Sequence, residues 1–316
     1  MSRSARALPV AAGAGDYTHV IPELFAAEFN PELYARTVFG EICNTKYEGR
    51  FKAMGDKIQI PTMPASTNRA HVEGADLVYD TLSPGNVEMV IARGIDNCWH
   101  IPTTALRQSN VKTLAEDFAK HAAKTVAGGT NGIDQTVLAN IYSSVHAKNK
   151  GLTAGIKSSD INLGVAGTPL AWTRTNAMEI IIERLAVVLA EQNIAEDEPL
   201  FLVVPPWAAA RVKNSEYKDS AMSGGQLLPA VNGRLGKVAG FTVFQSNNLD
   251  TSSSGGQTAY ECIFGHKMAT TFAAQMTIKE SLKHPTKYGD VMRTLTIYDF
   301  KVTMDKALGH LHIYKG

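Results

Sequence analysis

The sequence has no excess of charge of either sign, no long apolar run and almost no cysteine. Its 31 lysines and arginines face 30 aspartates and glutamates, which gives a formal net charge of +1 at pH 7. Dedicated nucleic-acid-binding proteins carry a marked basic excess, so this balance argues against that class. No apolar stretch approaches the ~20 residues that a membrane-spanning helix needs, which excludes a helical membrane protein.

The three cysteines, Cys43, Cys98 and Cys262, lie far apart and form no Cys-x-x-Cys motif. Their number and spacing fit a reducing compartment and predict neither a disulfide framework nor a metal site. With 44% hydrophobic and 19% charged residues, the chain can form a real core, so global disorder is excluded. Residues 1–20 are small and polar, and too poor in Leu, Ile and Phe for a signal peptide. We expect a flexible arm there.

Motifs that carry catalysis or bind cofactors are also absent. The sequence contains no Gly-x-Ser-x-Gly elbow, His-Glu-x-x-His helix, EF-hand loop or Gly-x-Gly-x-x-Gly fingerprint. Residues 233–237 resemble a phosphate loop only loosely, because the spacing is wrong and Val238 stands where Ser or Thr is needed. Ser215 and Lys218 match Ser-x-x-Lys but lack its companion motifs. The sequence therefore predicts no catalytic residue and no cofactor.

His310 and His312 are one residue apart in a segment with strand composition. Alternate residues of a strand share one face, as adjacent metal ligands can. No third ligand lies nearby in the sequence, so we interpret the pair as part of a polar strand face and predict no metal site.

The N-terminal half contains an unusually long extended region. Residues 57–60 and part of 87–101 alternate polar and apolar side chains at the strand period. Between them, residues 61–86 are rich in Pro, Ser, Thr, Asn and Gly, and a connection of this length usually has a function. We predict a long two-stranded hairpin over residues 55–101, with an irregular tip that projects from the body. Because an isolated two-stranded ribbon is marginal in water, it needs a further surface, which need not be its own body.

Helical spacing follows over residues 110–148, with Asn110 as the capping residue. Gly128–Gly132 interrupts this pattern, and the cost of glycine in a helix favours a break there. Asn30 followed by Pro31 predicts the start of an earlier helix. The Gly- and Ser-rich residues 149–169 mark the clearest boundary between two regions.

The second region has α/β patterning. Asn176 and Glu179 have the spacing of a reciprocal cap, and residues 178–189 give the helix after it a wide apolar face. The all-apolar residues 200–204 predict a strand buried on both faces. Further elements are predicted at 207–213 (helix), 237–245 (a strand around Gly240), and 260–264, 271–282, 292–304 and 308–314 (strands).

Several of these segments resemble major capsid proteins of tailed bacteriophages, and they occur in that family's order. Residues 200–205 (LFLVVP) are similar to its buried strand, and residues 232–246 match its pattern nGxlGxxxGfxvxxS. Residues 279–302 are similar to its returning strands, and residues 25–60 to its early helix and the base of its extended loop. The resemblance spans roughly residues 20–314.

The resemblance implies an α+β chain with the HK97-like capsid fold. An N-terminal arm would occupy residues 1–30. A peripheral β-sheet domain would comprise residues 31–169 and 251–316, including an extended β-hairpin loop at 55–101 and a long spine helix at 108–148. An axial α/β domain would comprise residues 170–250.

By the same resemblance, the chain would be a non-enzymatic major capsid protein that assembles into the icosahedral head shell of a tailed bacteriophage. Its copies would form hexamers and pentamers in the virion, assembled in the host cytoplasm without a membrane. Its partners would be a portal protein, a separate scaffolding protein and double-stranded DNA contacted non-specifically. Candidate inter-subunit contacts on the loop are Arg69, His71, Glu73, Val87, Met89, Ile91 and Arg93.

The composition is compatible with dense packing, because hundreds of copies with a large charge of one sign would repel one another. The family-like body begins near residue 25, so we expect no fused scaffolding segment. Some relatives join subunits through a loop lysine, but residues 58–94 contain none, so we predict no covalent lattice.

Two other interpretations remain open. One is an encapsulin-like nanocompartment shell, which shares the fold and differs in cargo. The other is an α/β enzyme with a site in the loop at residues 219–233, for which the sequence offers no nucleophile and base.

Overall fold

The computed structural model describes most of the chain from residue 37 to the C-terminus. The described residues are 37–47, 56–62, 67–71, 73–74, 76, 79, 81, 85–102, 121–122, 124–128, 131–194, 200–215, 237–254 and 256–316. The predicted arm at 1–30, the helix start at Asn30, the cap at Asn110 and the loop at 219–233 lie outside them. Within the described part, no helix has the length and apolarity to cross a bilayer.

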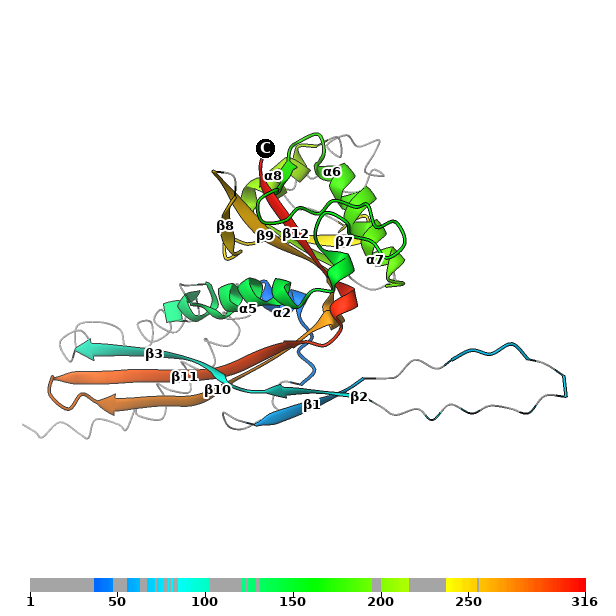
Figure 1. Ribbon diagram of the computed structural model, residues 1–316. Helices are drawn as coiled ribbons and strands as arrows, with labels where there is room; N and C mark the ends of the chain where they lie inside the picture. The colour runs from blue at the N-terminus through cyan, green and yellow to red at the C-terminus, as the bar shows by residue number, and fades with distance from the viewer. Residues whose placement is uncertain are drawn as a thin grey trace, which may run out of the picture.

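A seven-stranded mixed sheet forms the upper layer in Figure 1, and beside it lie the helices α6 (Ala177–Glu179), α7 (Val187–Glu191) and α8. Its strand order is β4-β12-β9-β5-β7-β6, and β8 pairs with β9 outside that order. Residues 200–204 form the predicted buried strand, β5, which pairs parallel with β7 and antiparallel with β9. The bounds are β4 (Leu170–Trp172), β5 (Leu200–Val204), β6 (Lys237–Val238), β7 (Phe241–Gln245), β8 (Thr251–Ser254), β9 (Gln257–His266), β12 (Leu308–Lys315) and α8 (Pro206–Lys213).

A second, three-stranded sheet extends below the first layer (Figure 1). It consists of β10 (Thr270–Lys283), β11 (Gly289–Val302) and β3 (Arg93–Pro102), all antiparallel. The short helices α2 (Phe39–Ile42) and α5 (Ile133–Ile141) lie over it. Phe39 of α2 packs against Phe272 of β10, with ring centroids 4.4 Å apart. Aromatic contacts of this kind fix the helix on the sheet.

The predicted ribbon is present at its base but is shorter than expected. β1 (Lys57–Thr62) and β2 (Gly85–Val90) pair antiparallel. The chain then leaves the ribbon at Ala92, whose amide donates to the Asp299 carboxylate over 3.0 Å, and β3 continues on β11. The prediction of one hairpin over 55–101 is therefore wrong beyond residue 90, because the alternation at 87–101 serves two different sheets.

The predicted break in the helical region is confirmed. Residues 124–128 are helical, Asn131 has a φ of 61°, and α5 starts at Ile133. Three-residue 3₁₀ turns follow at Tyr142–Ser144 and Ala147–Asn149. The residues in which a long helix would begin lie outside the described part of the chain.

Buried Asp134, in the first turn of α5, joins three segments that are far apart in sequence. Its Oδ1 accepts the amides of Val38 and Phe39, each over 3.1 Å. Its Oδ2 accepts from the Ser246 hydroxyl over 3.2 Å and from the side-chain Nδ2 of Asn248 over 3.0 Å. The carboxylate therefore ties α2 and the segment after β7 to the start of α5.

The sheet topology divides residues 251–316 between the two sheets. The predicted peripheral domain includes all of residues 251–316, whereas β8, β9 and β12 share a sheet with β5 and β7. Only β10 and β11 of that segment pair with β3 in the other sheet. Strand composition reveals that a segment is extended, but not which neighbour it pairs with.

The predicted reciprocal cap at residue 176 is wrong, although the apolar helix is present. The Asn176 side chain instead accepts from the Thr173 amide over 2.7 Å and donates to the Ala171 carbonyl over 2.8 Å. Glu179 forms an ion pair with Arg184 over 3.1 Å. The helix has α, π and α segments at α6 (Ala177–Glu179), Ile180–Ala186 and α7 (Val187–Glu191).

The predicted single strand at 237–245 is a hairpin. Ala239 and Gly240 have φ values of 47° and 81° and connect β6 to β7. Two consecutive residues with positive φ are typical of the tight turns that match strand twist. The alternation of side chains continues on both sides of Gly240, so the sequence pattern does not show that the chain reverses direction there.

Candidate assembly surface

The base of the ribbon packs on the chain's own lower sheet. Ile58, Ile60, Met89 and Ile91 form a small apolar cluster with side chains of β10 and β11, separate from the main core. Ile58 lies opposite Met89 across the ribbon. Alternate residues of a strand face one side, so the inner face of the ribbon is fixed to the body while its outer face remains free.

The tip of the ribbon has no such cover. Every described residue between 67 and 81 is exposed, and Tyr79 has 84% of its surface accessible. In Figure 1 the described tip residues extend far from both sheets. None of the described tip residues belongs to an apolar cluster of the chain. The tip therefore has the physical character of a docking element for another surface.

The predicted contact residues fall into two groups. Arg69, His71 and Glu73 lie on the exposed tip, where they are accessible to another molecule. Met89 and Ile91, in contrast, are buried in the chain's own cluster. This corrects the expectation that a neighbouring subunit covers these two side chains.

The other two predicted contacts lie at the ribbon base. Val87 is half-buried against the same apolar cluster. Arg93 lies 3.6 Å from Asp299 and stacks over the Phe300 ring with its guanidinium carbon 5.0 Å from the centroid. These contacts engage Arg93 within its own chain, although its side chain remains partly accessible.

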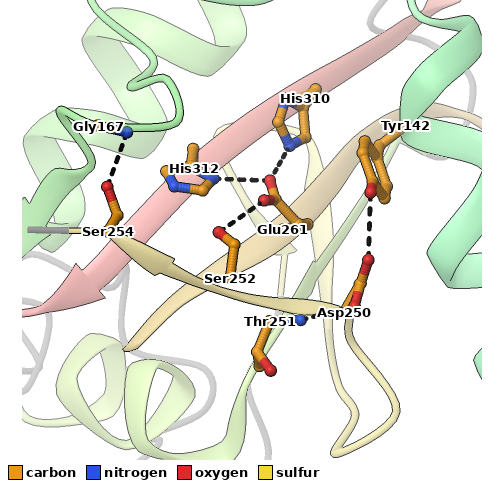
Figure 2. Close-up of polar contacts among 9 residues, drawn as sticks. All are labelled: Tyr142, Gly167, Asp250, Thr251, Ser252, Ser254, Glu261, His310 and His312. Carbon is orange, nitrogen blue, oxygen red and sulfur yellow. Dashed lines mark hydrogen bonds and ion pairs between the residues drawn. The ribbon is translucent and has the colours of Figure 1, made fainter. Parts of the chain in front are cut away.

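A buried polar cluster lies in the upper sheet, far from the ribbon, and sequence reasoning missed it. Figure 2 shows the carboxylate of Glu261 on β9 facing two histidines of β12. Its Oε2 lies 2.6 Å from His310 Nε2 and 2.7 Å from His312 Nδ1. Its Oε1 accepts from the Ser252 hydroxyl of β8 over 3.1 Å. Accessible fractions of the three main side chains are 9% for Glu261, 12% for His310 and 1% for His312.

The two histidines share one strand face, as predicted, but that face is buried rather than solvated. Glu261 is the cross-strand partner of His312 in the antiparallel register. Glu261 is thus 51 residues from His312 in sequence and directly opposite it in space. No spacing motif could have revealed it, because the register of β9 on β12 is set by the fold.

Aromatic and acidic neighbours complete this cluster. The Tyr142 ring stacks on His310 with centroids 5.1 Å apart, and its hydroxyl donates to Asp250 Oδ2 over 3.1 Å. Burial is the main cause that raises the pKa of Tyr142. The hydrogen bond to Asp250 and the negative charges of Asp250 and Glu261 raise this pKa further. Burial would raise the pKa of Glu261, but the hydrogen bonds and charges of His310 and His312 outweigh it and lower this pKa to about 2.

No family model matches the sequence, and no curated protein matches it either. Solved structures, in contrast, share its fold over most of its length. A structure from Mycobacterium phage Che8 is 18% identical, with 87% of this chain and 90% of that chain covered at a TM-score of 0.60. The capsid structure of the cyanophage P-SCSP1u is 16% identical, with 89% of both chains covered at a TM-score of 0.55.

A virus-like particle from Pyrococcus furiosus is also similar, at 11% identity and a TM-score of 0.50, with 94% of this chain and 99% of that chain covered. Identities this low establish a common fold and no more. These matches agree with the resemblance seen in the sequence. The chain therefore has the mixed α/β fold of HK97-like phage capsid proteins.

Proposed function

We propose that this chain is the major capsid protein of a tailed bacteriophage and forms its icosahedral head around double-stranded DNA. The observation that carries the proposal is the ribbon: its base is fixed to the body, and its described tip residues are all exposed. A second copy of the chain is the partner most readily supplied in a shell, where the same contact repeats. Fold similarity to a phage capsid structure supports this choice.

In this proposal, hexamers and pentamers are held by many weak contacts rather than by one strong interface. Once a ring begins to close, later contacts are effectively intramolecular, so each can be weak alone. The balanced charge of 31 basic and 30 acidic residues limits repulsion between copies. A separate scaffolding protein and a portal protein would direct closure, and DNA would be contacted without sequence readout.

The two sheets suggest the division of labour within a subunit. The lower sheet of β3, β10 and β11, together with the ribbon, would form the peripheral part. The upper sheet, with α6 to α8, would form the axial part, to which we add β8, β9 and β12. In this proposal residues 31–169 remain in the peripheral domain and residues 170–250 in the axial domain.

Expression of the full chain with its neighbouring genes, followed by negative-stain electron microscopy, tests the proposal. Closed polyhedra that contain nuclease-protected DNA after packaging are the expected result. Tyr79→Ser, at the tip, should lower the yield of particles without changing the stability of the subunit. Tyr288→Ser is the matched control, because Tyr288 is 92% accessible and lies on the β10–β11 turn at the other end of the molecule. A soluble monomer under all assembly conditions would overturn the proposal.

A nanocompartment shell is the second candidate, since the virus-like particle from Pyrococcus furiosus has a similar fold. Particles that enclose a specific protein and form without portal or terminase genes would favour it. An enzyme is less well supported. A cavity of about 420 Å³ is lined by Asp160, Asn162, Glu179, Glu183 and Arg184, but it offers no nucleophile beside a base.

A further inference from the structure

The buried cluster around Glu261 combines the atoms that a transition-metal site requires. Glu261 Oε2, His310 Nε2 and His312 Nδ1 lie within 4.8 Å of one another. Two imidazole nitrogens and one carboxylate oxygen form a ligand set that zinc uses in proteins, with a fourth position left for water. The three side chains are almost completely buried, so this group differs from the exposed acidic clusters that bind ions weakly at protein surfaces.

The strands hold these ligands on a rigid frame. Glu261 and His312 are direct partners in the β9–β12 ladder, and the His312 amide donates to the Leu163 carbonyl over 2.9 Å. Outer contacts orient the side chains: the Ser252 hydroxyl binds the free carboxylate oxygen, and the Tyr142 ring supports His310. Partners of this kind are what fixes the ligands of metal sites in place.

Two acidic side chains lie in this part of the upper sheet. Glu261 and Asp250 both lie here, with the Glu261 amide bonded to the Asp250 carbonyl over 3.0 Å. Among the described residues, no lysine or arginine pairs with Glu261, whose ionisable partners there are the two histidines. A buried carboxylate is costly unless a positive group faces it. A divalent cation would offset both carboxylates.

The hydrogen bonding of the cluster is also incomplete. His312 Nε2 is buried and has no partner within the described structure. This atom is the ring nitrogen that does not face Glu261, so an ion bound at Nδ1 would leave it unchanged. The present nitrogen-to-oxygen distances of 2.6 and 2.7 Å are those of hydrogen bonds. Around a tetrahedral ion at about 2.0 Å, the ligand atoms would stand roughly 3.3 Å apart, so they need to separate by about 0.6 Å.

We propose that Glu261, His310 and His312 bind one divalent transition-metal ion, best represented by zinc, which clamps β9 to β12 beneath Tyr142. Each neutral imidazole then carries its proton on the outer nitrogen and offers the inner lone pair to the ion. The ion reinforces the upper sheet where the segments around residues 142, 252, 261 and 310 meet. This inference does not depend on the role of the chain in a shell.

The test uses the full chain, stripped with a chelator and then exposed to zinc chloride. Elemental analysis after gel filtration should give one zinc per chain. Cobalt(II), added as an optical probe, should give the visible absorption of a tetrahedral site and lose it on addition of zinc. Saturation with zinc at about 100 times Kd should raise the melting temperature by roughly 5 °C.

Two ligand variants and one control locate the ion. Glu261→Gln keeps the shape of the side chain, and His310→Gln alters the most accessible ligand, so at least one should fold. Each should weaken zinc binding by about 100-fold or more, since even outer partners of metal ligands affect affinity by 10- to 100-fold. His284→Gln is the control, because His284 and His100, with ring centroids 4.9 Å apart, form the competing histidine pair.

The outcomes separate clearly. Loss of zinc in the folded ligand variants and its retention in His284→Gln support the site. The proposal is overturned if the stripped chain binds no zinc, if His310→Gln binds it as tightly as the parent, or if only His284→Gln loses it. In those cases the cluster is a hydrogen-bonded group without an ion.

Discussion

Replacement of Asp134 by alanine should destabilise the subunit more than any surface change. The carboxylate accepts the amides of Val38 and Phe39 and the side chains of Ser246 and Asn248. Removing the acceptor leaves buried donors unsatisfied, and each such donor costs about 1–3 kcal/mol. The donors partly relax toward water, so we expect a loss of about 3–5 kcal/mol in the free energy of unfolding, a large fraction of a typical total of about 5–15 kcal/mol.

Urea unfolding of the purified chain, followed by tryptophan fluorescence, measures this loss. Amide hydrogen exchange adds a local readout, because the Val38 and Phe39 amides should lose protection first. Asp160→Ala is the matched control, since Asp160 is an exposed aspartate, and it should change the unfolding free energy by less than about 0.5 kcal/mol. A loss below about 1 kcal/mol for Asp134→Ala, with unchanged exchange at residues 38 and 39, would refute the assigned role.

Three further predictions concern the ribbon and the thiols. Met89→Ala should lower the free energy of unfolding in urea by about 2–5 kcal/mol, because Met89 is only 2% accessible in the apolar cluster at the ribbon base. Val90→Ala should lower it little, because Val90 is 41% accessible on the other face of the ribbon. Equal losses for the two variants would contradict this packing. Boiled mature particles should run as a single band near 34.1 kDa in a denaturing gel, and a ladder of multimers would disprove the absence of cross-links. Iodoacetamide should label exposed Cys98 in the native chain but reach Cys43 and Cys262 only on unfolding, because burial raises the pKa of both thiols; rapid native labelling at three sites would count against this burial.

Local sequence patterns predicted helices and strands well where a segment lies in a single structural environment along its whole length. The apolar residues 200–204 are a buried strand in the centre of the upper sheet, and the glycines at 128–132 do break the helical region. Strand composition likewise located β9 to β12. The period of hydrophobic residues and the cost of glycine in a helix are local properties of the chain, so the sequence reveals them without tertiary information.

Tertiary pairing is what the sequence could not provide. The alternation at 87–101 continues across Ala92 although the strand changes partners there, from β1 to β11. Likewise, Glu261 meets His312 only because β9 and β12 pair in one register. The alternation around Met89 predicts that one face of its strand is covered, but it does not reveal that the chain's own lower sheet covers it.

The claim that the tip of the ribbon is completed by a second copy can be tested by hydrogen exchange on subunits and assembled particles side by side. We predict that the amides of residues 67–81 exchange freely in the subunit and become strongly protected in the particle, with residues 57–62 protected in both. Free exchange of residues 67–81 in closed particles, or their protection in the isolated monomer, would contradict this account.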